Sequence, residues 1–330
     1  MKSVRLITDL DQCRDLWRKV IPQEQLSDLW EIRDCFQREY NHRPCFLVAE
    51  EKGEITGFLP LSWNEEAGSY LYFPGETWEG KTWLEQNRLT VKDRGRLKTL
   101  LGFLPRPYNL RYLQDALSPR GMEPVVDEIG YYFYPPDYNF EMDRYYGRFS
   151  HKSHKRLIRE LSSWESRGVE FRYDEEADFQ NMIDMNLTRY GSMSYFHDGR
   201  FLRSFRSLYQ LLCDRGWSRL VAVLVEGRLA AVDMGAIFNS TYTLLAGGTS
   251  ADFPGVAKLI NLYHMQWACQ QKLDRVDFLC GDFNWKTLFH LTPRPLYLLS
   301  GAPVPSRRRV PTTPAFLTDT GADLTEVGVG

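Results

Sequence analysis

The sequence predicts an α/β protein (α+β in its strand order) that is built from two units and has mixed central sheets flanked by helices. Its 330 residues exceed what one ordinary core needs. Each half also repeats an order of strand, glycine turn, strand, further strand, helix and strand. The spacing from turn glycine to strand-end glycine is 22 residues in the first half (Gly53 to Gly75) and 21 in the second (Gly227 to Gly248). We expect units over 1–145 and 146–300 and a flexible tail over 301–330; chance similarity of two α/β units is the alternative.

Apolar periodicity assigns the elements of the first half. Helical spacing covers most of 9–40, and a glycine turn joins two apolar runs into a hairpin over 46–61. The remaining expected elements are a strand near 70–73, a helix over 83–103 and a short strand at 108–113, before proline-rich loops.

The second half begins with a basic helix over 148–168, which Gly168 ends. A strand at 169–173 and helices over 176–190 and 200–215 follow. The pattern then predicts the following elements: a hairpin over 219–238, a strand over 241–248, a helix over 255–271 and a strand over 276–280.

Composition excludes several classes of protein. Hydrophobic residues make up 43% and charged residues 25%, and the formal net charge is −2, so no global attraction to nucleic acid or anionic membrane is expected. The six cysteines show neither CxxC pairs nor metal-ligand spacing, which predicts reduced thiols and no metal site. Neither a signal peptide nor an 18-residue apolar run is present, so a cytoplasmic protein without membrane insertion is expected.

The stretch 275–289 draws attention as a candidate site. A short apolar run interrupted by Asp277 ends at Gly281, and Asp282, Trp285 and Lys286 follow directly. Charged and aromatic residues at a strand end often line a ligand site. A solvated Asp282–Lys286 pair at an ordinary strand end is the alternative.

Four motifs in the second half resemble the GNAT acyltransferase superfamily, specifically CelD-like acetyltransferase domains related to Fem-type peptidyltransferases. The motifs are, in order, the basic helix HKSHKRLIREL with its RGVEF exit, the hairpin VEGRLAA, the helix start FPGVAKL and the segment VDFLCGDFNWKTLF. They span roughly 150–290 in the order of that family. The resemblance implies tandem GNAT-like domains, of which the first is degenerate.

The resemblance implies acyl-CoA as co-substrate. The pyrophosphate cradle would be Gly255, Val256 and Ala257 at a helix start, where free N–H groups and the helix dipole favour anions. The pantetheine arm would pair with the backbone of residues Leu245, Ala246, Gly247 and Gly248. The cradle has less glycine than is usual for the superfamily and lacks its preceding Gln or Arg; an ordinary helix entry and strand end are the alternatives.

The candidate catalytic residues are Asp282, Lys286 and Asp233. A carboxylate at the strand mouth would take the proton of the amine, and Lys286 would stabilise the oxyanion or hold an anionic group. The residues expected to line the acceptor pocket are Tyr190, Tyr195, His197, Asp277 and Trp285. A solvated role for the loop histidine is the alternative.

The resemblance implies transfer of an acyl group, acetyl in the first place, to an amine on a sugar, a polysaccharide precursor or an amino compound. Two rivals stay open: a Fem-type transferase that uses aminoacyl-tRNA, and a non-catalytic scaffold of polysaccharide biosynthesis. The basic run 151–159 bears on the first rival. It is interpreted as a solvated helix face, a contact for an anionic substrate, or an RNA contact.

Overall fold

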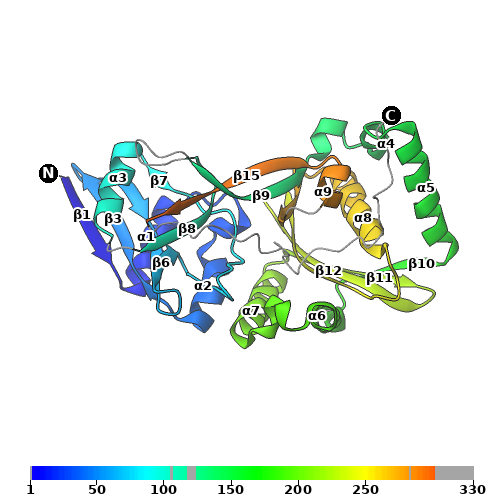
Figure 1. Cartoon of the computed structure of the whole chain (residues 1–330), viewed down its shortest axis with the longest axis horizontal. Coiled ribbons are helices and arrows are strands. Elements are labelled where there is room, and N and C mark those ends of the chain that lie inside the picture. The colour runs from blue at the N-terminus through cyan, green and yellow to red at the C-terminus, as the bar shows by residue number, and fades with distance from the viewer. Residues whose placement is uncertain (1, 105–106, 117–123, 282–283, 302–330) are drawn as a thin grey trace.

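A computed structural model describes residues 2–104, 107–116, 124–281 and 284–301. The described residues form an α/β protein with two sheets (Figure 1). The strands are β1 (Lys2–Ile7), β2 (Arg43–Pro44), β3 (Phe46–Glu51), β4 (Glu54–Leu59), β5 (Leu61–Asn64), β6 (Ser69–Tyr72), β7 (Thr90–Val91), β8 (Tyr108–Leu113), β9 (Val125–Phe133), β10 (Val169–Tyr173), β11 (Ser218–Val225), β12 (Arg228–Phe238), β13 (Thr241–Thr249), β14 (Arg275–Cys280) and β15 (Thr292–Ser300).

The helices lie on the faces of these sheets. They are α1 (Leu10–Val20), α2 (Trp30–Tyr40), α3 (Arg94–Gly102), α4 (Met142–Tyr146), α5 (His151–Ser166), α6 (Glu176–Tyr190), α7 (Gly199–Asp214), α8 (Val256–Gln270) and α9 (Asn284–Leu288). Among the described helices, none is long and apolar enough to cross a membrane.

The larger sheet has eleven strands and runs through both halves of the chain. Its order is β10-β11-β12-β13-β14-β9-β15-β8-β6-β5-β2, and the smaller sheet is β1-β3-β4-β7. In the second half, α6 and α7 cover one face of the large sheet, whereas α5 and α8 cover the other (Figure 1). This layering follows from long apolar strands that need cover on both faces.

Two strands tie the halves together. β9 pairs antiparallel with β14 of the second half, and β15 lies between β9 and β8 of the first half. Figure 1 shows β9 and β15 running side by side across the middle of the molecule. The last described strand therefore returns to the first half, and the two halves share one sheet.

The apolar core is also shared. One cluster around Trp17, Phe46 and Phe73 fills the first half. The largest cluster joins the halves. Phe36 of α2 stacks on Trp83 of the first half (ring centroids 5.4 Å apart) and also contacts Phe201 of α7 in the second half (5.9 Å). Burial of aromatic rings at this boundary holds α2 against α7.

Most elements expected from periodicity are confirmed, including both glycine-turn hairpins and the basic helix α5. The expected helix over 83–103 is wrong in its first part, because α3 covers only Arg94–Gly102. Residues 83–89 form an extended loop in which Gln86 has a positive φ of 66°. Strands β1, β9 and β15 were not predicted. The domain division 1–145, 146–300 and 301–330 stays a prediction, and 302–330 lie outside the described residues.

Candidate active site

The central feature of the site is an opening between β13 and β14. These parallel strands pair only from Thr241 to Thr243 with Arg275 to Asp277. Beyond that point β13 continues to Thr249 and β14 to Cys280 without further pairing between them. The register of β13 with β12 also shifts next to Leu245, which has no partner in β12. A bulge beside an opening is a common device at functional sites.

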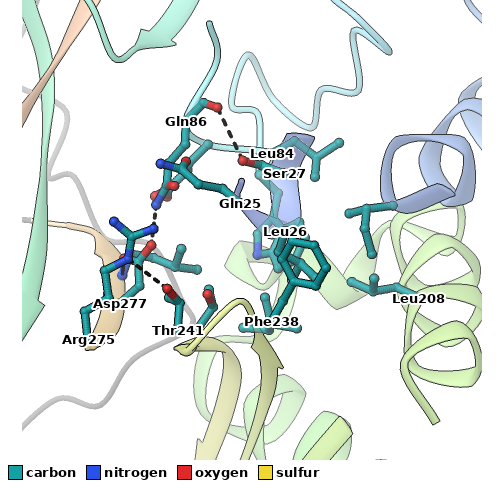
Figure 2. Close-up of a pocket in the computed structure, with 16 residues that line it drawn as sticks. Gln25, Leu26, Ser27, Leu84, Gln86, Leu208, Phe238, Thr241, Arg275 and Asp277 are labelled. Atoms are coloured by element: carbon teal, nitrogen blue, oxygen red, sulfur yellow. Dashed lines mark hydrogen bonds between the residues drawn. The ribbon is translucent and has the colours of Figure 1, made fainter. Parts of the chain in front are cut away.

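A cavity of about 40 Å³ lies at this opening, on the face of the sheet that α7 covers. Figure 2 shows that its walls come from both halves of the chain. The lining residues are Gln25, Leu26, Ser27, Ile32, Trp83, Leu84, Glu85 and Gln86 from the first half and Leu208, Phe238, Thr241, Thr243, Leu245, Arg275, Asp277 and Leu279 from the second.

Asp277 is the carboxylate that β14 brings to this cavity. Its side chain is buried, and its Oδ1 accepts a hydrogen bond from the Leu279 N–H at 2.9 Å. Its Oδ2 accepts a hydrogen bond from Nε2 of Gln86 (Figure 2). On the same wall, Arg275 Nε donates to Thr241 Oγ1 at 2.9 Å. The first half of the chain thus fixes the orientation of an acid on the second half.

Glu85 is the second carboxylate of the cavity. Its Oε2 accepts a hydrogen bond from the Cys280 N–H at 2.8 Å, which joins the loop 83–89 to the end of β14. Burial raises the pKa of Glu85, and the negative charge of Asp277 adds to the rise. The side chain keeps partial exposure, as expected for a group that faces a cavity. Raised carboxyl pKa values beside a second acid are typical of proton-transfer sites.

Lys286, a predicted catalytic residue, is fully buried beside the end of β14. Its Nζ donates hydrogen bonds to the carbonyl oxygens of Phe278 and Cys280, both at 2.9 Å, and of Leu279 at 3.1 Å. Burial lowers the pKa of this ammonium group. The lysine thus holds the strand end in shape. Its predicted partner Asp282 lies outside the described residues.

Asp233, the third predicted catalytic residue, lies on β12 and is fully buried. Its Oδ2 is 3.1 Å from Nε2 of His264 on α8, and His264 Nδ1 is 3.2 Å from Nη1 of Arg219. Burial lowers the pKa of His264. Asp233 is not among the residues that line the cavity. It takes part in a polar chain beneath α8, on the other face of the sheet.

The residues predicted to clamp the pantetheine arm lie on β13 and are buried. Leu245 lines the cavity, and Ala246 follows it on the part of β13 that does not pair with β14. The carbonyl oxygen of Gly247 accepts a hydrogen bond from Asn186 Nδ2 at 3.0 Å. A Cβ on Gly248 would lie 2.6 Å from the carbonyl oxygen of Met182, so glycine is required there by the close approach of α6.

The predicted phosphate cradle lies at the start of α8. Gly255 caps this helix with a positive φ of 89°, and Val256 and Ala257 open it with buried side chains. Nζ of Lys258 contacts both carboxylate oxygens of Glu160 at 2.5 and 2.6 Å. Lys258, at the start of α8, is therefore already ion-paired with Glu160 of α5.

The predicted acceptor residues are dispersed. Tyr195 is buried at the boundary of the halves, where its hydroxyl donates to the Thr82 carbonyl at 3.4 Å. Tyr190, at the end of α6, is half-buried, and His197 is exposed. Trp285 is buried on α9 and packs edge-on against Phe278 and Phe289. Of the five, only Asp277 lines the cavity.

The sequence interpretation missed Glu85 and Gln86. Helical periodicity over 83–103 concealed that this polar pair follows the buried Trp83 and Leu84 in a loop. The pair Glu85-Gln86 and the adjacent Asn87 form a polar run directly after two large apolar residues, and this was the available signal. Within the described ranges, no group of His, Cys, Asp and Glu side chains is suited to hold a metal ion.

Comparison with known structures supports the fold expectation. The chain is similar to a conserved protein of unknown function from Bacteroides thetaiotaomicron (TM-score 0.57, 12% identity, 90% of this chain and 99% of that chain). It is also similar to the C-terminal DUF2156 domain of a predicted lysylphosphatidylglycerol synthetase from Agrobacterium fabrum (TM-score 0.55, 12% identity, 89% and 93%). FemX gives a TM-score of 0.53 at 10% identity over 89% and 95%. Likeness at such identities concerns the fold alone.

The family comparison is more specific about the second half. No curated protein matches the chain. Residues 148–287 match the family described as acetyltransferase (GNAT) domain. This range contains β13, β14 and α8, which form the opening and the helix start beside it. The predicted fold class, tandem GNAT-like domains with mixed sheets flanked by helices, is confirmed. Residues 148–287, fewer than half of the chain, are thus similar to GNAT acetyltransferase domains.

Proposed function

We propose that the protein is a CelD-like N-acyltransferase that moves an acyl group, acetyl in the first place, from acyl-CoA to an amine. The acceptor amine would belong to a sugar, a polysaccharide precursor or an amino compound. The observation that carries the proposal is the opening between β13 and β14, which leads into a cavity lined by two carboxylates, Asp277 and Glu85. The acyltransferase family match over 148–287 supports it.

The donor side of the proposal uses the unpaired edge of β13. An extended pantetheine arm would add to this edge as a strand adds to a sheet, next to the bulge at Leu245. The pyrophosphate would lie at the start of α8, where the left-handed Gly255 leaves room and Lys258 supplies a positive charge. Glu160 would then have to release Lys258, so we expect Glu160→Gln to strengthen acyl-CoA binding.

The acceptor side of the proposal uses the cavity. A space of about 40 Å³ suits an amine group rather than a whole acceptor, because a single bound water already needs ~10–15 Å³ of such space. Asp277 already accepts two hydrogen bonds and would orient the amine. Glu85, whose pKa is raised, would accept the proton as the new N–C bond forms and the C–S bond to CoA breaks. CoA then leaves as the thiol or thiolate.

The test combines binding and turnover. Acetyl-CoA is expected to raise the Tm of the full chain, and release of free CoA thiol is expected when amino sugars and amino acids are added as acceptors. Glu85→Gln is expected to lower kcat by at least ~10² with little change in acetyl-CoA binding. A panel of CoA esters that changes neither Tm nor thiol release would contradict the proposal. A Tm shift without turnover for any amine would support a non-catalytic scaffold instead.

One observation favours a second candidate, a Fem-type transferase that takes its acyl group from aminoacyl-tRNA. Helix α5 exposes four cationic side chains, Lys152, Lys155, Arg156 and Arg159, and none of them forms an ion pair within the part of the chain described. Such a helix face suits a phosphate backbone. Under this candidate, tRNA binds in a salt-dependent manner and Lys152→Glu with Lys155→Glu weakens it; absence of tRNA binding at low salt would remove the candidate.

A further inference from the structure

A second cavity, of about 180 Å³, lies within the first half of the chain and plays no part in the proposed acyl transfer. For scale, an apolar cavity of about 150 Å³ holds a benzene molecule. The lining residues are Arg33, Ala67, Ser69, Leu71, Tyr72, Gly75, Glu76, Thr77, Gly80, Thr82, Leu84, Asn87, Asn109 and Arg111. The cavity thus combines opposite charges, amides and hydroxyls with an apolar wall.

Arg33 is the first charge of this cavity, and it has no anionic partner in contact. Its side chain is only 2% exposed. Nε donates to the Ser27 carbonyl at 2.8 Å, Nη1 to the Phe73 carbonyl at 2.7 Å and Nη2 to Oδ1 of Asn87 at 2.8 Å. All three acceptors are neutral, and a guanidinium group has five N–H donors. Two N–H donors of a buried cation are therefore left for another acceptor.

Glu76 is the second charge, and it too is 2% exposed. The two hydrogen bonds that it accepts from other residues both end on Oε1, one from the Thr82 hydroxyl and one from the Leu84 N–H at 2.7 Å. The backbone N–H of Glu76 also hydrogen-bonds its own carboxylate, and Oε2 can accept a further hydrogen bond from a ligand. Burial raises the pKa of this carboxyl, and the hydrogen bonds from Thr82 and Leu84 and the charge of Arg33 offset only part of that rise.

The two charges line one cavity, where each favours the charged form of the other across a distance. Within the described chain, no ion pair joins Arg33 to Glu76. The other lining cation, Arg111, is matched by Asp127, whose Oδ2 is 2.9 Å from Arg111 Nε. Arg33 and Glu76 remain without a contacting counter-ion, so a ligand with a single charge would contact only one of them.

From this arrangement we infer that the cavity between Arg33 and Glu76 binds a small amino-carboxylate zwitterion. The ligand carboxylate would accept hydrogen bonds from the remaining N–H groups of Arg33. Its ammonium group would donate to Oε2 of Glu76, and Leu71 and Leu84 would contact its aliphatic part. Each charge of the ligand thus meets the buried charge of opposite sign, which offsets the desolvation cost on both sides.

The site adjoins the acyl-transfer cavity but is separate from it. Leu84 lines both cavities, and its N–H bonds to Glu76 while the next residue, Glu85, faces the opening between β13 and β14. Glu76 and Glu85 are therefore two carboxylates that line different cavities, one on each side of Leu84. This pair provides the control for the experiment.

The test is isothermal titration calorimetry of the full chain with glycine, alanine, β-alanine and γ-aminobutyrate, which differ in the separation of their charges. Propionate and propylamine are the comparisons that carry one charge each. At least one zwitterion is expected to bind at least tenfold more tightly than both comparisons. In Glu76→Gln, binding of that zwitterion is expected to fall at least tenfold, whereas Glu85→Gln should leave it within about twofold.

Three results would overturn the inference. The first is that none of the four zwitterions binds measurably. The second is that propionate or propylamine binds as tightly as the best zwitterion. The third is that Glu85→Gln and Glu76→Gln lose zwitterion binding equally. The comparison between zwitterions and singly charged ligands uses the wild-type chain alone, so it decides the question even if Glu76→Gln does not fold. Acyl transfer is not the readout, and failure here is therefore distinct from failure of the proposed function.

Discussion

The buried position of Glu85 predicts an unusual pH dependence of stability. Glu85→Gln keeps the size of the side chain and an oxygen acceptor for the Cys280 N–H, and it removes the charge. Burial raises the pKa of Glu85 in the folded protein from the ordinary 4.5 to about 7. A rise of this size corresponds to ~3 kcal/mol between the charged and neutral carboxyl. Because the side chain keeps partial exposure to the cavity, we expect about 1–3 kcal/mol.

The sign of the effect follows from linkage. The folded-state pKa lies above the unfolded one, so the contribution of Glu85 to stability is full below about pH 4.5 and is lost as the pH rises through about 7. The glutamine variant has no such loss. The free energy of unfolding of Glu85→Gln relative to wild type should therefore increase by about 1–3 kcal/mol between about pH 5 and pH 8.

Urea unfolding followed by tryptophan fluorescence at several pH values measures this difference. Glu165→Gln on the exposed face of α5 controls for the loss of one negative charge, and its difference from wild type should stay constant over the same range. A difference for Glu85→Gln that does not change with pH would refute the assignment of Glu85 as a buried acid with a raised pKa. The acyl-transfer rate of the wild type should then also lack an ascending limb governed by this group.

Three further substitutions test the roles of residues that the sequence analysis selected. Gly248→Ala should destabilise the protein by ~1–3 kcal/mol in urea unfolding, because the new Cβ would lie 2.6 Å from the Met182 carbonyl oxygen; Gly102→Ala, with no atom within 4 Å, should not. Lys286→Met should lower stability by ~3 kcal/mol or more, because two buried carbonyl groups and one part-buried carbonyl group lose their common donor; unchanged stability would contradict the role assigned to Lys286 at the end of β14. Asp233→Asn should lower stability by ~1–3 kcal/mol and leave kcat nearly unchanged, whereas a fall in kcat at unchanged stability would support its predicted catalytic role.

The parts of the fold that local chemistry determines were predictable. Both hairpins follow from a glycine turn between apolar runs. Helix α5 follows from the N-cap Ser150, whose Oγ accepts the Ser153 N–H at 3.2 Å, and from the stop at Gly168. These signals lie within a few residues of the element that they define, so they do not depend on distant parts of the chain.

The strands that join the halves were not predictable from local patterns. β15 contains Pro293 and Pro295, which argue against a strand inside a sheet. The structure resolves the conflict, because β15 pairs with β8 only from Tyr297 onward, so both prolines lie where the strand has β9 alone as partner. Pairing between segments more than a hundred residues apart leaves no periodicity signal in either segment.

The same reasoning explains what was and was not predicted about the site. Asp277 was selected because an acid interrupts a buried strand, and that property is local. Glu85 and Gln86 act on residues nearly two hundred positions away, at Cys280 and Asp277, and nothing in their own segment indicates this. Residues from the second half alone would thus give an incomplete cavity.

The contribution of the first half to the cavity argues that the two halves work as one unit. Gln86 orients Asp277, and Glu85 holds the Cys280 N–H at the end of β14. The opposite side of β14 pairs with β9, another strand of the first half. Without these contacts, Asp277 would lose a hydrogen-bond donor and β14 would lose a neighbouring strand. The segment 148–287, which matches a GNAT acetyltransferase domain, therefore carries the opening, whereas the geometry of the carboxylates depends on residues outside that match.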